Sequence, residues 1–504
     1  MKFWIQLAYV CFMMSLPIIS LSQKKVINLP FEFEKSALSA SDYDAYFLNN
    51  TNDSGFSFVL KDNKKAEYVL FDKNFKIISK IDMDLKSTVF NENIIDYRGG
   101  TVNGNTYQYV YDEAEKKYLG RSATVLQLES IDFNSKTIKH QKIFEIPKAE
   151  TLLSSFSDNN IFYTITADDK KKEMIIYAVN KSGVVSTNNI AINIPSTAGK
   201  NRDKISTYFS GLKVFKTGEE TNLSAISSRV KLFAQPGKLE FVTNIGADPA
   251  HIVTIGIPSF TIQEKFIDYA QFDEGEKKMT VNSFLVKGQL FSLMVDKKTI
   301  RVAVHDISTG KLQHQFEINE ESPFSIFAKS PVYEVRYGKQ RSEDKEIDDI
   351  KKLIKWLNGS TEGILINEND KGQLIVTIGN YDLFKTSTPG SNMGGLQYTL
   401  SSYDGSGAYV YNPNLNYRPG TLSTITSPGY YASTYFKLLM DSNGSKIEKG
   451  KLTESVTDQV KDYLKTVDPK VKAANQFNIG ERQFYGYYNK DEKSYIVEEM
   501  NIVK

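Results

Sequence analysis

Residues 292–318 read SLMVDKKTIRVAVHDISTGKLQHQFEI, which is three runs of alternating apolar and polar residues joined by two polar turns. The turns begin at Asp296 and Asp306. Alternation with a period of two places Val, Ile and Phe on one face of a β-strand. Aspartate closes a tight turn because its carboxylate accepts hydrogen bonds from the backbone just after it. The stretch therefore predicts three antiparallel strands joined by two hairpin turns.

The same plan recurs at other places in the chain. Residues 58–78 read FVLKDNKKAEYVLFDKNFKII, and residues 162–185 read FYTITADDKKKEMIIYAVNKSGVV. Two further stretches contain only the second turn. The turn residues that we assign in these copies are Asp62 with Asp72, Asp169 with Asn180, Asp132, and Asp441. A recurring unit of this kind predicts a repeat architecture.

Two of the copies are alike beyond this general plan. Residues 132–141 align without gaps on residues 306–315, and each stretch contains a histidine (His140 or His314) that Phe-Glu-Ile follows shortly afterwards. Second turns at positions 72, 132, 180, 306 and 441 fit repeats of roughly 45–65 residues. Four-stranded propeller blades recur at about 40–50 residues. The spacing therefore favours a propeller in which some copies have diverged.

Residues 302–318, VAVHDISTGKLQHQFEI, resemble the outer-strand segment of quinoprotein- and WD-type propeller blades. In those blades a strand, an Asp turn, Thr-Gly-Lys and another strand recur. His314 stands where such blades usually carry an aromatic residue, and the chain has no repeat of their tryptophan pattern. The resemblance therefore implies the architecture alone, and no quinone cofactor is carried over to this chain.

We expect an all-β fold over residues 23–504, a β-propeller of about six to eight four-stranded blades. A pair of β-sandwiches is the alternative, because alternating strands alone do not exclude it. The strand-like run Ser494–Val503 is expected to close the propeller by pairing with Val26–Phe33.

Three segments depart from the repeat. Residues 342–358 predict an amphipathic helix with Ser342 as its N-cap, and residues 453–467 predict a second helix. Residues 386–436 are rich in Tyr, Gly and Ser and contain only two charged residues, so we expect a long inserted loop. Its tyrosines offer flat apolar faces with polar tips, which suit contact with a protein or a glycan, although a loop without a ligand is the simpler interpretation. The tyrosines expected to make this contact are Tyr398, Tyr403, Tyr409, Tyr411, Tyr417, Tyr430 and Tyr431.

The first 22 residues have the pattern of a secretory signal peptide, with Lys2 before an apolar run and a cleavage site between Ser22 and Gln23. The only cysteine, Cys11, lies in that run, so the mature chain is expected to have no thiol or disulfide. No later segment is apolar for the length of a membrane-spanning helix. The composition, rich in Lys, Asn, Ile and Tyr, is similar to that of Bacteroidetes-type envelope proteins, which implies the periplasm or the outer cell surface.

Little catalytic chemistry is visible in the sequence. The formal net charge of +2 argues against a nucleic-acid partner. No nucleotide-binding, nucleophile-elbow or metal-binding motif occurs, so we expect no cofactor and no metal and assign no catalytic residue. His305 is expected to be exposed, His140 and His314 to be partly buried structural residues, and His251 to have no partner.

These observations lead to two alternative functions. The first is an exported, non-enzymatic binding or scaffold protein of the cell envelope that recognises a protein or a glycan through the tyrosine-rich loop. The second is a carbohydrate-active hydrolase or lyase with its site at the propeller axis. The second requires acidic residues and a histidine that converge at the axis, and a channel lined by lysine would exclude it.

Overall fold

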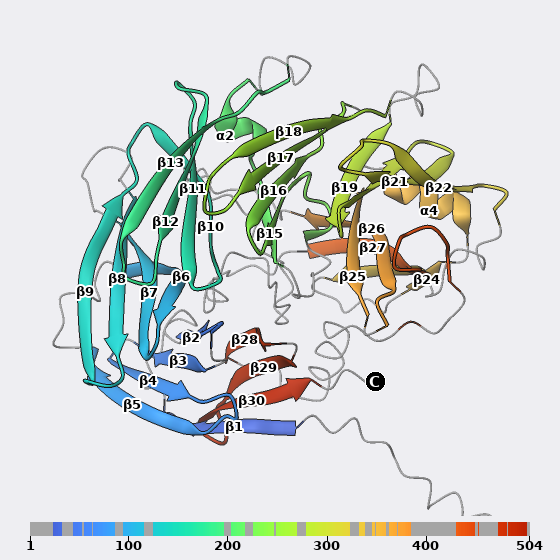
Figure 1. Ribbon diagram of the computed structural model, residues 1–504. Helices are drawn as coiled ribbons and strands as arrows, with labels where there is room; N and C mark the ends of the chain where they lie inside the picture. Colours follow the sequence, from blue (N-terminus) through green and yellow to red (C-terminus); the bar gives the residue numbers. More distant parts are fainter. Residues whose placement is uncertain are drawn as a thin grey trace, which may run out of the picture.

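The structure is a computed structural model whose sheets are arranged around a common centre (Figure 1). It describes residues 24–32, 44–52, 55–62, 64–85, 94–114, 124–195, 203–216, 225–245, 248–269, 279–322, 332–337, 345–347, 349–358, 362–369, 371–384, 430–448, 452, 472–480 and 482–500. These residues form seven sheets, five with four strands and two with five. The expected all-β propeller is therefore confirmed, and its blade number lies within the expected range.

The first three blades each contain four consecutive antiparallel strands. Blade 1 contains β2 (Asp44–Asn49), β3 (Phe56–Lys61), β4 (Lys65–Phe71) and β5 (Ile77–Asp84). Blade 2 contains β6 (Ile94–Asn103), β7 (Thr106–Ala114), β8 (Thr124–Asp132) and β9 (Thr137–Glu145). Blade 3 contains β10 (Glu150–Asp158), β11 (Ile161–Asp168), β12 (Glu173–Val179) and β13 (Val185–Ala191).

Blades 4 and 6 are less regular, whereas blade 5 repeats the plan of four consecutive antiparallel strands. Blade 4 contains β14 (Lys213–Lys216), which is parallel to β15 (Val230–Gln235), and then β16 (Lys238–Thr243), β17 (Ala250–Gly256) and β18 (Ile262–Ile267). Blade 5 contains β19 (Thr280–Val286), β20 (Gln289–Val295), β21 (Thr299–Asp306) and β22 (Leu312–Asn319). In blade 6 the spatial order is β24 (Lys345–Ile347), β23 (Val332–Tyr337), β27 (Tyr430–Met440), β26 (Leu374–Phe384) and β25 (Glu362–Glu368). Neighbouring blades contact one another through strands near the centre, as blade 5 does with β19 and blade 6 with β25.

Blade 7 is completed by the N-terminal strand. It contains β28 (Lys472–Ile479), β29 (Arg482–Asn489) and β30 (Ser494–Met500), and β1 (Lys24–Pro30) pairs antiparallel with β30. The expected pairing of the two chain ends is therefore confirmed. It gives β30 a hydrogen-bonding partner on its outer side, so this strand presents no open edge.

The second turns of the sequence repeat occupy equivalent positions. Asp72, Asp132, Asn180 and Asp306 lie between the third and fourth strands of blades 1, 2, 3 and 5, and Asp441 follows the third strand of blade 6. Each side chain accepts hydrogen bonds from the backbone just beyond it, as Asp306 does from the Thr309 amide at 2.8 Å. The local turn chemistry therefore identified the blade repeat correctly.

One first turn was assigned to the wrong residue. Asp62 and Asp296 cap the turns between the second and third strands of their blades, as expected. In blade 3 this role belongs to Asp168, whose carboxylate accepts from the Lys170 amide at 3.0 Å. Asp169 instead accepts from the amide and hydroxyl groups of Ser206. Neighbouring strand residues point to opposite sides, so only one of two adjacent aspartates can face the turn.

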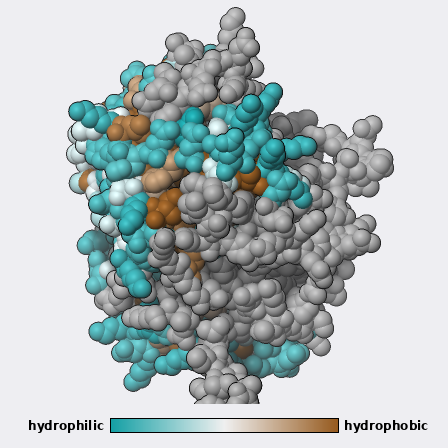
Figure 2. Space-filling view, turned by 90° about the vertical axis from the view of Figure 1, so that its right-hand side faces the viewer, coloured by the Kyte–Doolittle hydropathy of each residue, from teal (hydrophilic) through white to brown (hydrophobic). Residues whose placement is uncertain are grey.

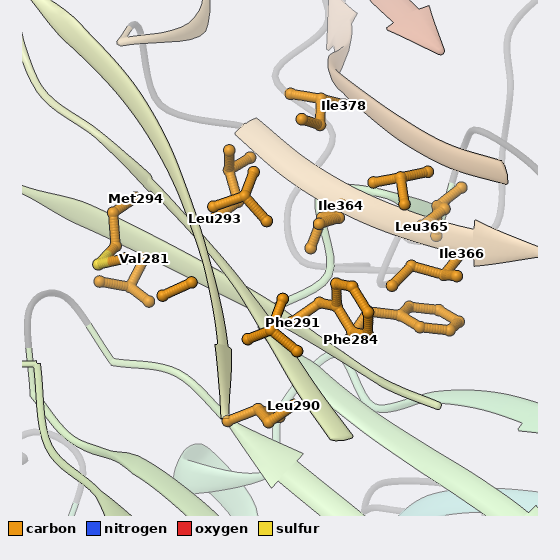
Figure 3. Close-up of a cluster of buried hydrophobic side chains, with 14 of the residues drawn as sticks. Val281, Phe284, Leu290, Phe291, Leu293, Met294, Ile364, Leu365, Ile366 and Ile378 are labelled. Atoms are coloured by element: carbon orange, nitrogen blue, oxygen red, sulfur yellow. The ribbon is translucent and has the colours of Figure 1, made fainter. Parts of the chain in front are cut away.

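The apolar core lies between successive blades. Phe47 of blade 1 stacks on Phe477 of blade 7 with ring centroids 4.1 Å apart. Figure 3 shows the core shared by blades 5 and 6, in which Phe284 and Phe291 face Ile364 and other residues of β25. Side chains of the described residues on the face shown in Figure 2 are mostly hydrophilic, with small scattered apolar groups.

The helical predictions need correction. The first helix, α4, covers only Ile350–Leu357, and its N-cap is Asp349, which accepts from the Lys351 amide at 2.9 Å. Residues 345–347, expected to be helical, pair with β23 as strand β24, because sheet pairing outweighs their helical periodicity. Ser342 and the helix expected over 453–467 lie outside the described residues. A short helix that the sequence did not predict, α2, covers Ile205–Tyr208.

The expected inserted loop also ends earlier than predicted. Tyr430 and Tyr431 belong to β27, which pairs with β26 on one side and β23 on the other. Both sets of backbone hydrogen bonds favour an extended strand despite the Ser and Gly residues nearby. Within the described residues, neither helix is long and apolar enough to cross a membrane.

Candidate functional site

The site predicted from the sequence is untested. Five of the seven tyrosines, Tyr398, Tyr403, Tyr409, Tyr411 and Tyr417, lie outside the described residues, as does the cleavage site between Ser22 and Gln23. Tyr430 and Tyr431 are placed only as part of strand β27. The contact role of these tyrosines and the cleavage site therefore stay predictions.

Two of the four histidines are placed differently from expectation. His305 was expected to be exposed, but its exposed fraction is 1%. It lies on the third strand of blade 5, where both faces are covered, and its ring lies 6.1 Å from that of Tyr269. His140 and His314 lie on fourth strands and are partly buried, as expected. His251 was expected to have no partner and instead has two.

His251 is the centre of a hydrogen-bonded relay of three side chains, which we call the blade 4 relay: Tyr208, His251 and Glu264. The Tyr208 hydroxyl lies 3.0 Å from Nδ1 of His251. Nε2 of the same ring lies 2.9 Å from Oε2 of Glu264. The Glu264 carboxylate also accepts a hydrogen bond of 3.1 Å from the side-chain amide of Asn193. These distances are within normal hydrogen-bonding range.

The strand register brings the relay together. His251 on β17 pairs directly with Phe266 on β18, and their rings stack at 4.5 Å. Glu264 lies two residues earlier on β18, on the same face as Phe266, so its carboxylate reaches the imidazole diagonally. Helix α2 supplies Tyr208, whose hydroxyl meets the other nitrogen of the His251 ring. Phe266 is 49% exposed, so its ring lies over the imidazole on the outer surface of blade 4.

The hydrogen bonds fix the protonation of the ring. A carboxylate only accepts hydrogen bonds, so Nε2 of His251 carries the proton that it donates to Glu264. Nδ1 is then the acceptor and takes its hydrogen bond from the Tyr208 hydroxyl. Burial lowers the pKa of His251, and the bond to Glu264 opposes this change. Burial and the charges of Asp248 and Glu264 raise the pKa of Tyr208. A neutral imidazole therefore faces a neutral phenol at pH 7.

This arrangement combines a weak nucleophile, a base and a group that orients the base. Tyr208 has an oxygen that becomes nucleophilic when it loses its proton, and His251 is positioned to accept that proton. Glu264 holds the ring in the required tautomer and would stabilise the imidazolium that forms. The described residues contain no group of three or more side chains suited to hold a metal ion.

A second polar group lies where blades 4, 5 and 6 meet, and we call it the inner-strand cluster: Arg229, Lys231, Asn282 and Glu362. Arg229 donates to Oε1 of Glu362 at 2.8 Å. The carbohydrate-active alternative requires acidic residues and a histidine that converge. These four described residues include two basic side chains, one carboxylate and no histidine, so the expected acidic site is not found among them.

No protein-family model matches the chain, and no curated protein is similar to it in sequence. Solved structures with some likeness include an apocarotenoid oxygenase from Synechocystis (7% identity, TM-score 0.27, covering 55% of this chain and 64% of the other). They also include prolyl oligopeptidase B from Galerina marginata, with 8% identity and a TM-score of 0.29, where the match covers 67% of this chain and 47% of the other. A third is puromycin hydrolase, with 10% identity and a TM-score of 0.26, where the match covers 64% of this chain and 40% of the other. The matches span less than two thirds of the length of these proteins.

These comparisons correct the expected function. The similar structures are enzymes, whereas the first expectation was a non-enzymatic binding or scaffold protein of the cell envelope. That expectation is contradicted and is set aside. The likeness is too slight to carry an activity over to this chain, so the function must be argued from the chain's own side chains.

A strong signal for the relay is absent from the sequence. Tyr208 and His251 are separated by 43 positions, and Tyr208 lies in a helix that the repeat did not predict. One indication was present: residues 250–256 alternate well enough to form a strand, and a strand would have placed His251 opposite a partner on the next strand.

Proposed function

We propose that the protein is an enzyme that uses the blade 4 relay for nucleophilic catalysis of a hydrolytic reaction. The observation that carries this proposal is the continuous series of two hydrogen bonds, 3.0 and 2.9 Å long, from Tyr208 through His251 to Glu264. A nucleophile, a base and an orienting carboxylate within such distances form the general pattern of an activated nucleophile.

The reaction begins with proton transfer within the relay. The Tyr208 oxygen forms a bond to the electrophilic centre of the substrate while Nδ1 of His251 takes the phenolic proton. The imidazolium then gives that proton to the leaving group, and Glu264 stabilises its charge meanwhile. Water attacks the tyrosyl intermediate, loses a proton to His251 and releases the product, and the proton returns to Tyr208.

Phe266 determines access to this chemistry. Its exposed ring covers the imidazole, and both Tyr208 and His251 are buried. A change of the Phe266 rotamer would uncover the imidazole without altering the strands. The exposed ring also offers an apolar surface on which a flat part of a substrate can stack.

A hydrolysis screen tests the proposal. Purified protein is assayed with the p-nitrophenyl acetate ester, phosphate and glycosides, which differ in their electrophilic centre. We expect turnover of one class, reduced about 100-fold or more by His251→Gln because a positioned base contributes at least that much. Tyr208→Phe should abolish turnover. His314→Gln, on the outer strand of blade 5, is the matched control and should keep full activity.

Two results would count against the proposal. One is a folded protein that hydrolyses none of the three classes. The other is turnover that His251→Gln and Tyr208→Phe leave at the rate of the control variant. Circular dichroism of every variant excludes loss of fold as the reason for lost activity.

We also propose that the enzyme works outside the cytoplasm, in the periplasm or on the outer cell surface of a Bacteroidetes-type bacterium. The support is the signal-peptide pattern of residues 1–22 and the absence of cysteine from residues 23–504. N-terminal sequencing of protein purified from native cells should give a chain that begins at Gln23. Protein that begins at Met1 in the cytoplasmic fraction is the contrary result.

A further inference from the structure

The inner-strand cluster joins three blades through charged and polar side chains. Besides its bond to Glu362 of β25, Arg229 donates to the Val281 carbonyl of β19 at 3.0 Å. Lys231 of β15 donates to the Ser228 carbonyl at 2.6 Å and to the side-chain oxygen of Asn282. The Asn282 amide donates to the same Ser228 carbonyl at 3.1 Å.

A close backbone approach holds this arrangement in place. A Cβ atom at Gly363 would lie 1.8 Å from the carbonyl oxygen of Ile226, so only glycine fits at this position of β25. The segment that carries Ile226, Ser228 and Arg229 therefore rests directly on strand β25 of blade 6. The cluster is fixed in position by the main chain as well as by its side chains.

The cluster leaves hydrogen-bonding capacity unused. Glu362 has no exposed surface, and its Oε2 atom has no hydrogen-bond partner among the described residues. The side chain of Arg229 is 26% exposed, and its guanidinium has five N–H donors for the two acceptors that it meets. A buried carboxylate oxygen without a donor is costly, which indicates that a further group occupies this place.

The cluster has more basic side chains than acidic ones. Arg229 and Lys231 face a single carboxylate, that of Glu362. Burial, and secondarily the charge of Arg229, lowers the pKa of Lys231 well below its ordinary value. A neutral amine has two N–H groups, and the Ser228 carbonyl and Asn282 oxygen accept both. The protonated amine has a third donor, which only an additional acceptor would satisfy.

We propose that the inner-strand cluster binds a small ligand that carries a carboxylate beside a hydroxyl or ammonium group, which is the chemistry of a hydroxy acid or an amino acid. The ligand's carboxylate meets the exposed N–H groups of Arg229 and the third donor of Lys231. The adjacent hydroxyl or ammonium group donates to Oε2 of Glu362. The site is separate from the blade 4 relay, so it does not depend on the proposed hydrolysis.

Titration calorimetry of the whole chain tests this proposal with four probes. Glycolate and glycine each carry both groups, acetate lacks the donor, and glycerol lacks the carboxylate. We expect glycolate or glycine to bind at least tenfold more tightly than acetate, and glycerol not to bind. Glycolate alone would identify a hydroxy acid, and glycine alone would identify an amino acid.

Proton uptake supplies a readout that needs no variant. The ligand's carboxylate favours the charged form of Lys231, so binding measured over a series of pH values should take up a proton wherever the amine of the free chain is neutral. The heat of binding should then change with the ionisation enthalpy of the buffer, which a comparison of phosphate with Tris measures. Binding without proton uptake contradicts the role assigned to Lys231 and overturns the proposal.

Variants locate the binding. Arg229→Gln should weaken it at least tenfold, and Glu362→Gln should remove the preference for glycolate or glycine over acetate. Arg301→Gln is the matched control, because that guanidinium pairs with Glu317 at the outer side of blade 5. The proposal fails if no probe binds the wild-type chain, or if folded Arg229→Gln and Arg301→Gln bind equally well.

Discussion

The contact between blades 7 and 1 differs in character from the contact among blades 4, 5 and 6. The first is made by phenyl rings, with Phe58 lying 5.2 Å from Phe477 in an edge arrangement. The second shares an apolar core as well, but it also buries Lys231 and Glu362 beside the partly exposed Arg229.

The buried charges indicate that the contact among blades 4 to 6 is the one with a functional site. The rings between blades 7 and 1 pack directly on one another, and the charged groups that reach them, Arg482 over Phe75 and Lys65 over Phe31, are not buried. A stable contact between blades therefore does not need buried charges. Buried charges lose their hydration, and packed apolar side chains of similar volume are often as stable or more so. The charges on blades 4 to 6 are therefore better explained by a ligand than by the closure of the ring.

The largest effect is expected in the aromatic contact. Phe58 has no exposed surface and packs against rings from both blades. Phe58→Ala should lower the free energy of unfolding by about 3–5 kcal/mol, through lost burial and the cavity left behind. Urea denaturation measures this change. Ile78→Ala, at a 56% exposed position of blade 1, is the control and should change stability little.

A smaller loss is expected in the charged contact. Glu362→Gln removes the negative partner of Arg229 and should lower the free energy of unfolding by about 3 kcal/mol. Glu368→Gln breaks an exposed pair between β25 and Lys287 in the turn after β19, so the loss should stay below about 1 kcal/mol. Equal losses in the two variants would mean that the buried pair has no special role.

The pH dependence of stability should separate the two contacts further. Burial lowers the pKa of His305, and neither ring nitrogen has a hydrogen-bond partner among the described residues. Below the ordinary histidine value of about 6.5, the unfolded chain therefore binds a proton that the folded chain does not. The stability of the fold is therefore unaffected by this histidine above about pH 6.5, and it falls as the pH drops below that value.

Urea midpoints between pH 8 and pH 5 test this expectation. For a single histidine the slope approaches about 1.4 kcal/mol per pH unit below pH 6.5. His305→Asn removes the titrating group and should make the decline shallower than in the wild-type chain. Gln315→Asn, on the neighbouring strand, changes no titrating group and is the comparison that should leave the decline unchanged.

The smallest effect concerns the turns capped by aspartate or asparagine side chains. Asp168 accepts from two backbone amides, so Asp168→Ala should cost about 1 kcal/mol of unfolding free energy. Asn180→Ala in the next turn of the same blade should cost a similar amount. A loss of several kcal/mol at either position would show that these turns hold the blades together rather than capping them locally.

The regular blades could be predicted from the sequence because their signals are local. Alternation and turn chemistry operate over a few residues, so Asp72, Asp132 and Asp306 identified equivalent turns. The pairing of β1 with β30 followed from two strand-like chain ends in a fold that must close. The first helix was mislocated because its periodicity continued into residues that pair as a strand.

The candidate sites could not be predicted because their partners are distant in the sequence. Arg229 meets Glu362 across 133 positions, and the irregular connections of blades 4 and 6 determine that meeting. His305 was misjudged because alternation identifies the two faces of a strand but not what covers each face. Only the packing of one blade on the next shows that both faces of β21 are buried.

The most direct test of the blade 4 relay measures the reactivity of its tyrosine. An aryl sulfonyl fluoride transfers its sulfonyl group to a tyrosine oxygen, fluoride leaves, and a nearby base takes the phenolic proton. Peptide mass spectrometry follows the labelling of Tyr208 in the wild-type chain, His251→Gln and the His314→Gln control. The account predicts that Tyr208 is labelled faster than the other tyrosines and that only His251→Gln slows it, by about 100-fold. Labelling of Tyr208 that is slow in the wild-type chain, or equally fast in His251→Gln, would contradict the account.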